Sequence, residues 1–317
     1  MELKSLAEKL KKLKSAALFC HVSPDGDTVG AALALFFSLK KAGAEADLYC
    51  TDKIPDKFSF LEGADKFSSL PLEREYEAYI AIDAADISRL GQYEKDFKTK
   101  KTTFNIDHHI SNNFFAKNNY VKNCAANSEN IYEILTAGNF EIDKTVAECL
   151  LTGIVTDTGN FKHKNVTPET LFIAGKLLEK GADLNKIVYN TMVKQSKERA
   201  KLFIKVMNGI RYLLDDKLGV VTVRLKDIEE AGARQEDTEG FIDFLMGIDN
   251  VKVGVCIMET EKDKYKISFR SKGTDVNAVA GVFGGGGHKL ASGCRLFGNI
   301  EEIIDKIRYA VKQHLPE

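Results

Sequence analysis

The sequence has no apolar run long enough to cross a membrane. The longest candidate, residues 30–39, is short beside the roughly 20 residues that a spanning helix needs, and Lys40 and Lys41 follow it. Residues 1–14 combine Leu and Lys at helical spacing and lack the apolar core and small-residue cleavage site of a secretory signal. We therefore expect a cytoplasmic protein with no membrane partner.

Cysteine and proline are both scarce. The six cysteines among 317 residues form no C-x-x-C pair, which argues against a zinc ribbon and a disulfide framework. Most lie in apolar surroundings, so we interpret them as reduced thiols of the core. Only five prolines, with 44% hydrophobic and 29% charged residues, indicate a folded globular chain, and the length is sufficient for two domains.

An excess of positive charge is also missing. Lys and Arg number 45 against 46 Asp and Glu, for a net charge of -1. A protein that tracks a long nucleic acid usually carries a basic stripe, because affinity grows with each phosphate that it neutralises. If a nucleic acid is the substrate it should therefore be short, and a long one is not an expected partner. The oligomeric state is left open, and a homodimer is compatible with the sequence.

Strand-like and helix-like segments alternate along the chain, which predicts an α/β fold with a parallel sheet covered on both faces. We expect an N-terminal parallel-sheet domain over residues 1–185, a Lys-rich helical linker over 186–208 and a smaller α/β domain over 209–317. The expected strands are 16–21, 46–50, 78–83, 102–107, 220–225, 251–259, 265–270 and 291–296. The expected helices are 30–41, 127–136, 145–155, a helix from Thr167-Pro168-Glu169, 238–246, 277–283 and 300–314.

Acids and imidazoles follow four apolar runs of the N-terminal part. The carboxyl ends of parallel strands share one sheet edge, where ligands bind, so we expect these side chains to gather there. Taken alone, an Asp-Gly-Asp turn is most often solvated, and a His-His pair is most often a surface or capping pair. Three of the six histidines lie at the ends of these runs, however, and this clustering favours a functional site. The residues are His21, Asp25, Asp27, Asp83, Asp107, His108, His109 and Asp157.

Four carboxylates brought together repel one another unless cations lie between them. Two divalent ions would balance Asp25, Asp27, Asp83 and Asp157. Asp25 and Asp27, one glycine apart, can reach different metals, and a central acid such as Asp83 can bridge. Mixed imidazole and carboxylate ligands favour manganese, iron or zinc over magnesium or calcium. Such a metal pair activates water and holds a phosphoryl group, so the pattern predicts a two-metal phosphoesterase.

A glycine run in the C-terminal part predicts an anion-binding segment. Glycines lack Cβ, so their backbone amides can approach an anion closely, although flexible loops also contain such runs. The histidine after the run and an upstream Arg-Ser-Lys segment would add donors and charge for a terminal phosphate or nucleotide. The expected substrate-binding residues are Arg270, Ser271, Lys272, Gly285, Gly286, Gly287 and His288.

In order and spacing, these motifs resemble those of the DHH phosphoesterases, named for the triplet that is Asp107-His108-His109 here. The other motifs are His21-x-x-x-Asp25-x-Asp27, Asp83, Asp157-Thr158-Gly159 and, in the part that resembles the DHH-associated domain, residues 284–293 with 268–272 upstream. The resemblance covers essentially the whole chain. In length the chain is similar to the bacterial nano-RNase and 3'-phosphoadenosine-5'-phosphate (pAp) phosphatase branch.

The resemblance implies a role for each residue. One manganese ion would bind His21, Asp25 and Asp83, and a second would bind Asp27, Asp83, His108 and Asp157. Asp107 would orient a histidine, and His109 would donate to the phosphate or act as general acid. The implied reactions are hydrolysis of very short oligoribonucleotides to 5'-mononucleotides and of pAp to AMP.

Other functions share the N-terminal motifs. Hydrolysis of a cyclic dinucleotide or of its linear product pApA is the main alternative. An inorganic pyrophosphatase ranks lower, because His288 and the segment 270–272 suit a nucleotide better than bare pyrophosphate. A processive exonuclease is disfavoured by the net charge. A degenerate nucleotide-binding module would lack a ligand, and every ligand position is filled.

Overall fold

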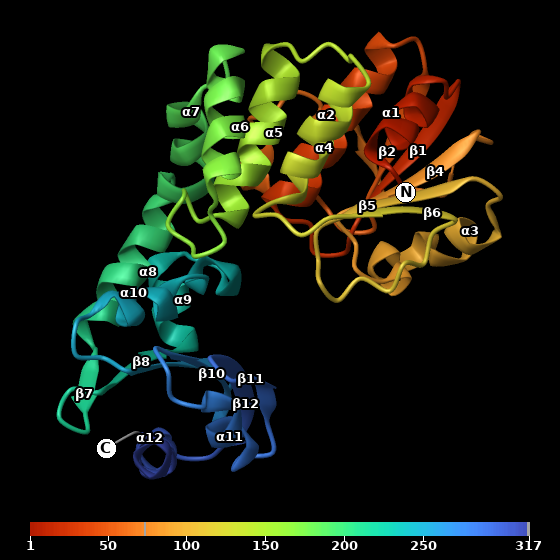
Figure 1. Ribbon diagram of the computed structural model, residues 1–317. Helices are drawn as coiled ribbons and strands as arrows, with labels where there is room; N and C mark the ends of the chain where they lie inside the picture. The colour runs from red at the N-terminus through yellow and green to blue at the C-terminus, as the bar shows by residue number, and fades with distance from the viewer. Residues whose placement is uncertain (73, 316–317) are drawn as a thin grey trace. The chain divides into compact units, whose positions relative to one another are not determined.

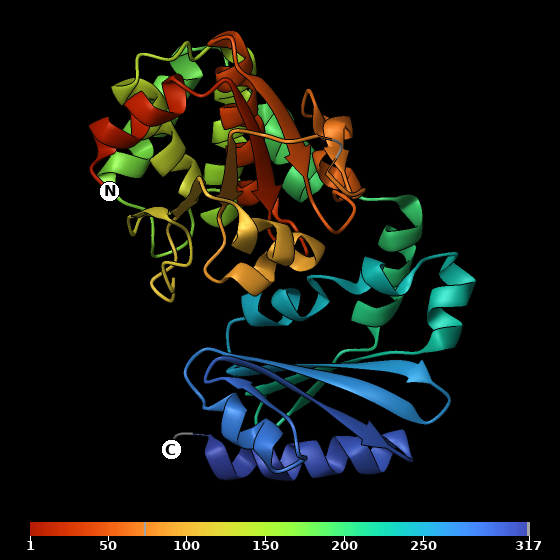
Figure 2. The same ribbon diagram turned by 90° about the vertical axis from the view of Figure 1, so that its right-hand side faces the viewer.

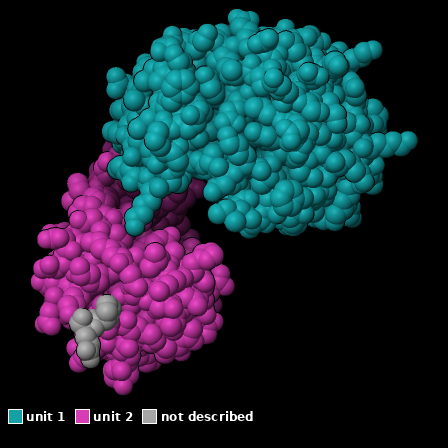
Figure 3. Space-filling model, in the orientation of Figure 1, with its two compact units in different colours: residues 1–194 teal, residues 195–317 magenta. Residues whose placement is uncertain are grey.

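The computed structural model divides the chain into two compact units, residues 1–194 and 195–317 (Figure 3). It describes residues 1–72 and 74–315. The division falls inside the segment expected to be a helical linker. That segment is not one helix: α7 (Leu184–Val188) and a π-helical turn (Tyr189–Val193) precede a break, and α8 (Lys197–Asn208) follows it. The break precedes Ser196, whose side chain accepts a hydrogen bond from the Arg199 backbone and so starts a new helix.

The first unit is built on a six-stranded sheet in the order β3-β2-β1-β4-β5-β6 (Figure 1). All its neighbouring strands are parallel. From β1 the chain continues to β2 on one side and returns to β4 on the other, so the strand order reverses between β1 and β4. In open α/β sheets that point is a ligand-binding crevice. The strands are β1 (Ser15–Cys20), β2 (Glu45–Tyr49), β3 (Phe67–Ser68), β4 (Ala78–Ile82), β5 (Thr103–Asp107) and β6 (Asn118–Val121).

Both faces of this sheet are buried, and successive residues of β1 alternate between them. Leu18 and Cys20 face the larger core, which includes residues of α1, α2, α4, α5 and α6. Ala17 and Phe19 face an aromatic cluster that includes residues of η3 and α3. The flanking elements are α1 (Leu3–Lys11), α2 (Gly26–Lys41), η1 (Asp56–Phe58), η2 (Ala64–Lys66), η3 (Ile87–Tyr93), α3 (Glu94–Thr99), α4 (Asn127–Ala137), α5 (Lys144–Asp157) and α6 (Pro168–Glu179).

The second unit contains a mixed six-stranded sheet in the order β11-β12-β10-β9-β8-β7. Helices cover both of its faces (Figure 2): α11 and α12 contribute to one core and α8, α9 and α10 to the other. Its elements after α8 are β7 (Arg211–Leu213), β8 (Leu218–Val223), α9 (Leu225–Ala231), η5 (Gln235–Thr238), α10 (Phe241–Gly247), β9 (Val253–Glu261), β10 (Lys264–Ser271), α11 (Val276–Gly281), β11 (Gly286–His288), β12 (Ala291–Phe297) and α12 (Ile300–His314).

The structure confirms the predicted α/β fold, with a parallel sheet followed by a second sheet. One boundary was wrong: helix α2 begins at Gly26 rather than at residue 30, because the Asp25 side chain caps it. The helix expected over residues 145–155 is α5, and the apolar run before Asp157 is the end of that helix. The six cysteines are free thiols, five of them buried. Within the described residues, no helix combines the length and apolar character that a membrane crossing requires.

Candidate active site

Three neighbouring strands of the first unit bring side chains to the carboxyl edge of the sheet. His21 follows β1, Asp83 follows β4, and Asp107 is the last residue of β5, with His108 and His109 next. Because β1 and β4 flank the point where the strand order reverses, these residues lie where ligands bind in this class of sheet.

The loop after β1 adds two acids at the start of helix α2. Asp25 is the N-cap: its Oδ1 accepts hydrogen bonds from the backbone N–H groups of Asp27 and Thr28, both at 3.0 Å. Its other oxygen lies 3.6 Å from Nε2 of His21. Capping therefore uses one oxygen of Asp25 and leaves the second directed at the imidazole.

Asp27 is fully buried and is oriented by the first residues of helix α4. Its Oδ1 accepts hydrogen bonds from the backbone N–H and the hydroxyl of Ser128, at 2.9 and 2.6 Å, and its Oδ2 accepts one from the Asn127 backbone N–H. Unpaired N–H groups at a helix N-terminus favour negative charge. These contacts fix the carboxylate and favour its ionised form, against burial and then Asp83, which raise the pKa of Asp27 to about 7.

Asp157 reaches the site from the C-terminal end of α5 because α2 and α5 pack closely. A Cβ on Gly30 would collide with the backbone oxygen of Cys149, and a Cβ on Gly153 would collide with Ser128 and lie 2.5 Å from Oδ1 of Asp27. Only glycine permits this approach, which places both acids within reach of the same ion.

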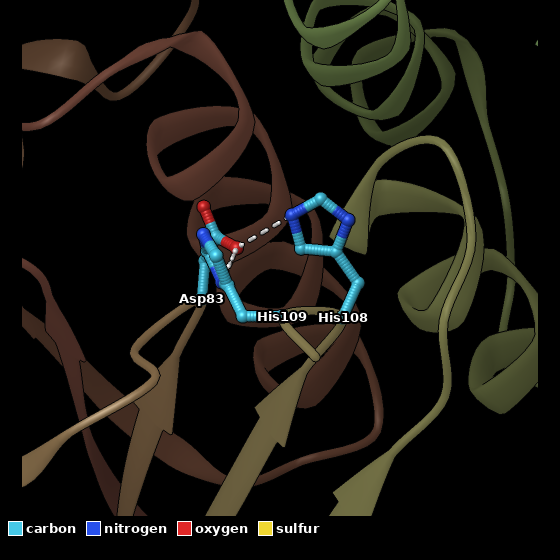
Figure 4. A group of neighbouring side chains, drawn as sticks. All are labelled: Asp83, His108 and His109. Carbon is cyan, nitrogen blue, oxygen red and sulfur yellow. Dashed lines mark ion pairs between the residues drawn. The ribbon is translucent and has the colours of Figure 1, made fainter. Parts of the chain in front are cut away.

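Asp83 is the centre of the arrangement (Figure 4). It is 2% exposed and has φ of 59°. Its Oδ1 lies 3.4 Å from Nε2 of His108 and 3.6 Å from Nδ1 of His109, and its Oδ2 lies 3.7 Å from Nε2 of His21. The buried Oδ1 has no hydrogen-bond partner. Buried polar groups are normally satisfied, so this atom needs a ligand such as a cation.

The donors fall into groups of three with ligand atoms within 4.8 Å of one another. One group is His21, Asp25 and Asp83; another is Asp27, His108 and Asp157. Asp83 contacts imidazoles of both groups, so it can bridge two ions. The imidazole and carboxylate donors and the orphaned oxygen of Asp83 fit divalent transition metals.

Without cations, the groups hold protons in their place. Burial would lower the pKa of His21, but hydrogen bonds to Asp25 and Asp83 raise it to about 10. Burial would also lower the pKa of His108, but a hydrogen bond to Cys124 and the charges of Asp83 and Asp27 raise it to about 11. Burial and then Asp27 and Asp83 raise the pKa of Asp157. Cations that bind here would displace these protons.

A third group, Asp83 with His108 and His109, has a different chemistry. Nδ1 of His109 donates to Oδ1 of Asp107 at 2.7 Å, so this nitrogen is not a free ligand and Nε2 faces away from Asp107. The hydrogen bond to Asp107, more than any other interaction, raises the pKa of His109. A half-exposed histidine held in this way can donate a proton through Nε2.

Two polar residues that sequence reasoning missed complete this environment. Asn112 donates to Oδ2 of Asp107 at 2.6 Å and to the carbonyl of Ala84 at 3.1 Å, so it supports both Asp107 and the backbone after Asp83. A guanidinium nitrogen of Arg89 lies 3.0 Å from Nδ1 of His21. Arg89 lies in the short helical element η3 and Asn112 lies at the end of a turn, and no local sequence pattern marks either residue.

In the second unit, the Arg-Ser-Lys segment does not act as one group. Strand β12 lies between β10 and β11, and its residue Ala291 is paired with Arg270 on one side and with His288 on the other. Because directly paired residues point to the same face of a sheet, Arg270 and His288 share a sheet face. Ser271 instead donates to the Thr274 carbonyl at 2.6 Å. Lys272 donates to the Ile248 carbonyl at 2.8 Å, at the end of α10. The role of these residues in substrate binding stays a prediction, with Arg270 and His288 as its best-placed members.

The glycine run leads into a strand: Gly284 and Gly285 precede β11, and Gly286 and Gly287 belong to it. A Cβ on Gly285 or Gly287 would collide with backbone atoms of β12. The Gly285 amide donates to the Ala280 carbonyl at 2.9 Å, and the Gly287 amide donates to Asn277 at 2.8 Å. Close strand packing therefore explains these two glycines. Anion binding by the run stays a prediction, and the amides of Gly285 and Gly287 already have partners within the protein.

Models of protein families match both units. The model described as DHH family, N-terminal domain, matches residues 15–154, and that of the DHHA1 domain matches residues 215–313. A curated relative is 30% identical over 99% of this chain and 94% of its own length. The chain belongs to the DHH family, as its motifs predicted. That relative is the bifunctional oligoribonuclease and PAP phosphatase NrnA of Thermus thermophilus.

Two solved structures share the fold. An exopolyphosphatase-related protein from Bacteroides fragilis has a TM-score of 0.86 at 24% identity, covering 98% of this chain and 95% of that one. RecJ of Thermus thermophilus, solved in complex with Mn²⁺, has a TM-score of 0.54 at 11% identity, covering 99% of this chain and 55% of that one. The close agreement with the first structure spans nearly the full length of both chains.

Proposed function

We propose that this protein hydrolyses phosphoester bonds in very short oligoribonucleotides, releasing 5'-mononucleotides, and removes the 3'-phosphate of pAp to give AMP. The observation that carries the proposal is the pair of ligand groups joined by Asp83, with the Asp107–His109 pair beside it. Binding and activation of a phosphoryl group need such a constellation.

We assign His21, Asp25 and Asp83 to one cation, and Asp27, His108 and Asp157, with Asp83, to the other. Two bound divalent cations would supply an activated water and neutralise charge on the phosphoryl oxygens. Manganese is our choice, because the ligands mix imidazole with carboxylate and RecJ, which shares the fold, was solved with Mn²⁺.

His109 is the proton donor in this proposal. The leaving ribose oxygen needs a proton as its bond to phosphorus breaks, and Nε2 of His109 supplies it. Asp107 holds the imidazole through Nδ1 and favours its protonated form. The buried carboxylate thus orients the ring without contacting the substrate.

The preference for short substrates follows from charge. The chain has 45 basic against 46 acidic residues, so it lacks the excess of cations that long strands require. The Thermus thermophilus relative is named for oligoribonuclease and PAP phosphatase activities, which agrees with a substrate that offers one or two phosphates. Within the second unit, Arg270 and His288 are our candidates for substrate-binding residues.

The test compares substrates in one assay. The purified protein with Mn²⁺ is incubated with a 5'-phosphorylated diribonucleotide, an oligoribonucleotide of about 24 residues, pAp, cyclic di-AMP, pApA and pyrophosphate, and products are separated by chromatography. Asp83→Ala is the blank, and Asp96→Ala, which removes an exposed acid of α3, is the matched control. Rapid cleavage of the diribonucleotide and pAp, with the long strand slow, supports the proposal. Preference for cyclic di-AMP or pyrophosphate would contradict it, and so would cleavage of pApA without cleavage of a 5'-phosphorylated diribonucleotide that carries other bases.

A further inference from the structure

We propose that Arg89 is a phosphate-binding residue, whose guanidinium contacts a phosphoryl oxygen of the substrate once cations occupy the groups around Asp83. The inference deepens the proposed function and rests on it for the identity of the substrate. It starts from the contact between Arg89 and His21, a residue assigned to the first ligand group.

The backbone of Arg89 is fixed to the end of strand β1. Its N–H donates to the Asp86 carbonyl at 3.0 Å, and its carbonyl accepts from the N–H of Val22 at 2.7 Å. Val22 directly follows His21, so the hydrogen bond ties η3 to the strand end that carries this imidazole. Arg89 is therefore held beside the site by backbone hydrogen bonds and not by a loose loop.

Residues 90–92 make further hydrogen bonds that hold η3 in place. Thr51 donates to the Leu90 carbonyl at 3.2 Å and accepts from the N–H of Gln92 at 3.1 Å. Between them Gly91 has φ of 59°, and a Cβ there would collide with Thr51 and lie 2.9 Å from Val22. Only glycine meets both conditions, so the local backbone is specialised for this position.

The side chain of Arg89 lies against a ring nitrogen of His21 that cannot be its acceptor in a cation-loaded site. Nδ1 of His21 lies 2.8 Å from the carbonyl of Val22, which can only accept, and 3.0 Å from Nη2 of Arg89, which can only donate. One ring nitrogen cannot donate to the first and accept from the second. The position of the ring proton decides between them.

A cation settles that position. Nε2 of His21 faces Asp25 and Asp83, at 3.6 and 3.7 Å, and must offer its lone pair to a metal ion. The ring proton then lies on Nδ1 and is donated to Val22, the arrangement usual for metal-bound histidine. In the loaded site the Arg89 guanidinium therefore has no acceptor on His21.

The residue then has the properties of a phosphate ligand. Arg89 is exposed, permanently charged, and placed beside a group of carboxylates that bound cations would neutralise. Guanidinium groups bind phosphate oxygens through two parallel hydrogen bonds. Its acceptor in the loaded site is therefore a phosphoryl oxygen of the substrate.

The experiment measures metal and phosphate binding separately. Arg89→Ala and Arg89→Lys are compared with wild type and with Lys95→Ala, which removes the same charge from an exposed position in α3. Free Mn²⁺ is followed by electron paramagnetic resonance, and inorganic phosphate is titrated calorimetrically into the Mn²⁺-loaded full-length protein. Hydrolysis of the 5'-phosphorylated diribonucleotide is measured on the same samples.

We expect every variant to keep its Mn²⁺ affinity within about twofold, because Arg89 is not a ligand. Arg89→Ala should bind phosphate about 10- to 100-fold more weakly, the range for losing hydrogen bonds between charged groups. Arg89→Lys should fall between, since it keeps the charge and loses the planar fork. Lys95→Ala should match wild type.

Three results would overturn the assignment: no phosphate binding by the loaded wild type, equal phosphate affinity in Arg89→Ala and Lys95→Ala, or loss of Mn²⁺ with Arg89→Ala. The last would make Arg89 a support for His21. If phosphate binding depends on Arg89 but no nucleotide is cleaved, the proposed function fails and the assignment stands. If the wild type cleaves nucleotides but its phosphate binding is independent of Arg89, the proposed function stands and the assignment fails.

Discussion

Replacing Asp107 by Asn tests how the site controls the proton on His109. Asp107 is fully buried and accepts two hydrogen bonds, from Nδ1 of His109 at 2.7 Å and from the Asn112 amide at 2.6 Å. An asparagine offers one oxygen and one NH₂ group, so it can satisfy only one of these donors. Asn112 cannot turn its own amide, because it also donates to Ala84 at 3.1 Å and accepts from Phe114 at 2.7 Å.

The new side chain must therefore direct its oxygen at Asn112 and its NH₂ group at His109. Nδ1 of His109 then accepts, and the ring proton moves to Nε2 of a neutral imidazole. The carboxylate that raised the pKa of His109 is gone, so protonation of the ring is disfavoured. Asp107→Asn therefore preserves the shape of the side chain but disfavours the protonated form of His109 that acts as the general acid.

The magnitude follows from the bond that is lost. A hydrogen bond to a charged group is worth about 1.5–3 kcal/mol, and about 1.4 kcal/mol is a factor of ten. We expect kcat to fall by about 10- to 100-fold near neutral pH, within the range for loss of general acid catalysis. A group with a raised pKa stays protonated to higher pH, so the high-pH fall in kcat should move to lower pH in the variant.

The assay is a pH profile of kcat with pAp, read as released phosphate, alongside Mn²⁺ binding. Asp107 belongs to neither ligand group assigned to a cation, so Mn²⁺ affinity should stay within about twofold. Asp96→Asn, an exposed acid of α3, controls for the loss of charge. A fall in kcat without a shift of the profile, or with loss of Mn²⁺, would refute the reasoning.

Two further predictions concern the metal groups. The pKa values of His21 and His108, about 10 and about 11, exceed that of the unfolded chain, about 6.5. The metal-free protein should therefore lose stability as pH rises from about 6.5 toward these values. Melting in EDTA at about pH 6 and about pH 8.5 checks this, and a rise in Tm with pH would contradict it. Gly153→Ala should lower Mn²⁺ affinity, since its Cβ would meet Asp27, and should destabilise the fold by about 1–3 kcal/mol. Gly175→Ala, in a helix with open space around it, is the control for both Mn²⁺ titration and melting; equal behaviour of the two variants would sink the prediction.

Part of this site could be predicted because the sheet carries it. The strands before His21, Asp83 and Asp107 are buried on both faces, so each is a short apolar run that stops at a polar residue. Parallel strands of one sheet align their carboxyl ends, and that rule alone brings the three residues together. No knowledge of side-chain packing is needed.

Asp157 shows where this reasoning stops. A short apolar run cannot be assigned to a strand or a buried helix by periodicity alone, and this one is the end of α5. Its approach to Asp27 depends on Gly30 and Gly153, which lie far apart in the sequence and meet only after α2 and α5 pack. The apolar run before Asp157 indicated the residue, and packing explains its position.

The glycine run shows that a structure can require glycine for two different reasons. Missing side chains allow an anion to approach, but they also allow another strand to approach. Gly285 and Gly287 pack against β12 and their amides are already engaged. Glycine is a poor strand former, so the sequence argued against the strand that the structure contains.

Arg89 and Asn112 reveal a different limit. Arg89 lies in the short element η3 and Asn112 at the end of a turn, where the sequence does not distinguish a polar side chain that faces water from one that faces a site. Their partners are His21 and Asp107, residues that the strand ends alone identify. What the strand ends leave open is which groups surround His21 and Asp107, and these two contacts supply part of the answer. The sheet thus places the charges of the site, whereas the segments around it add hydrogen-bond partners, and the chemistry depends on both.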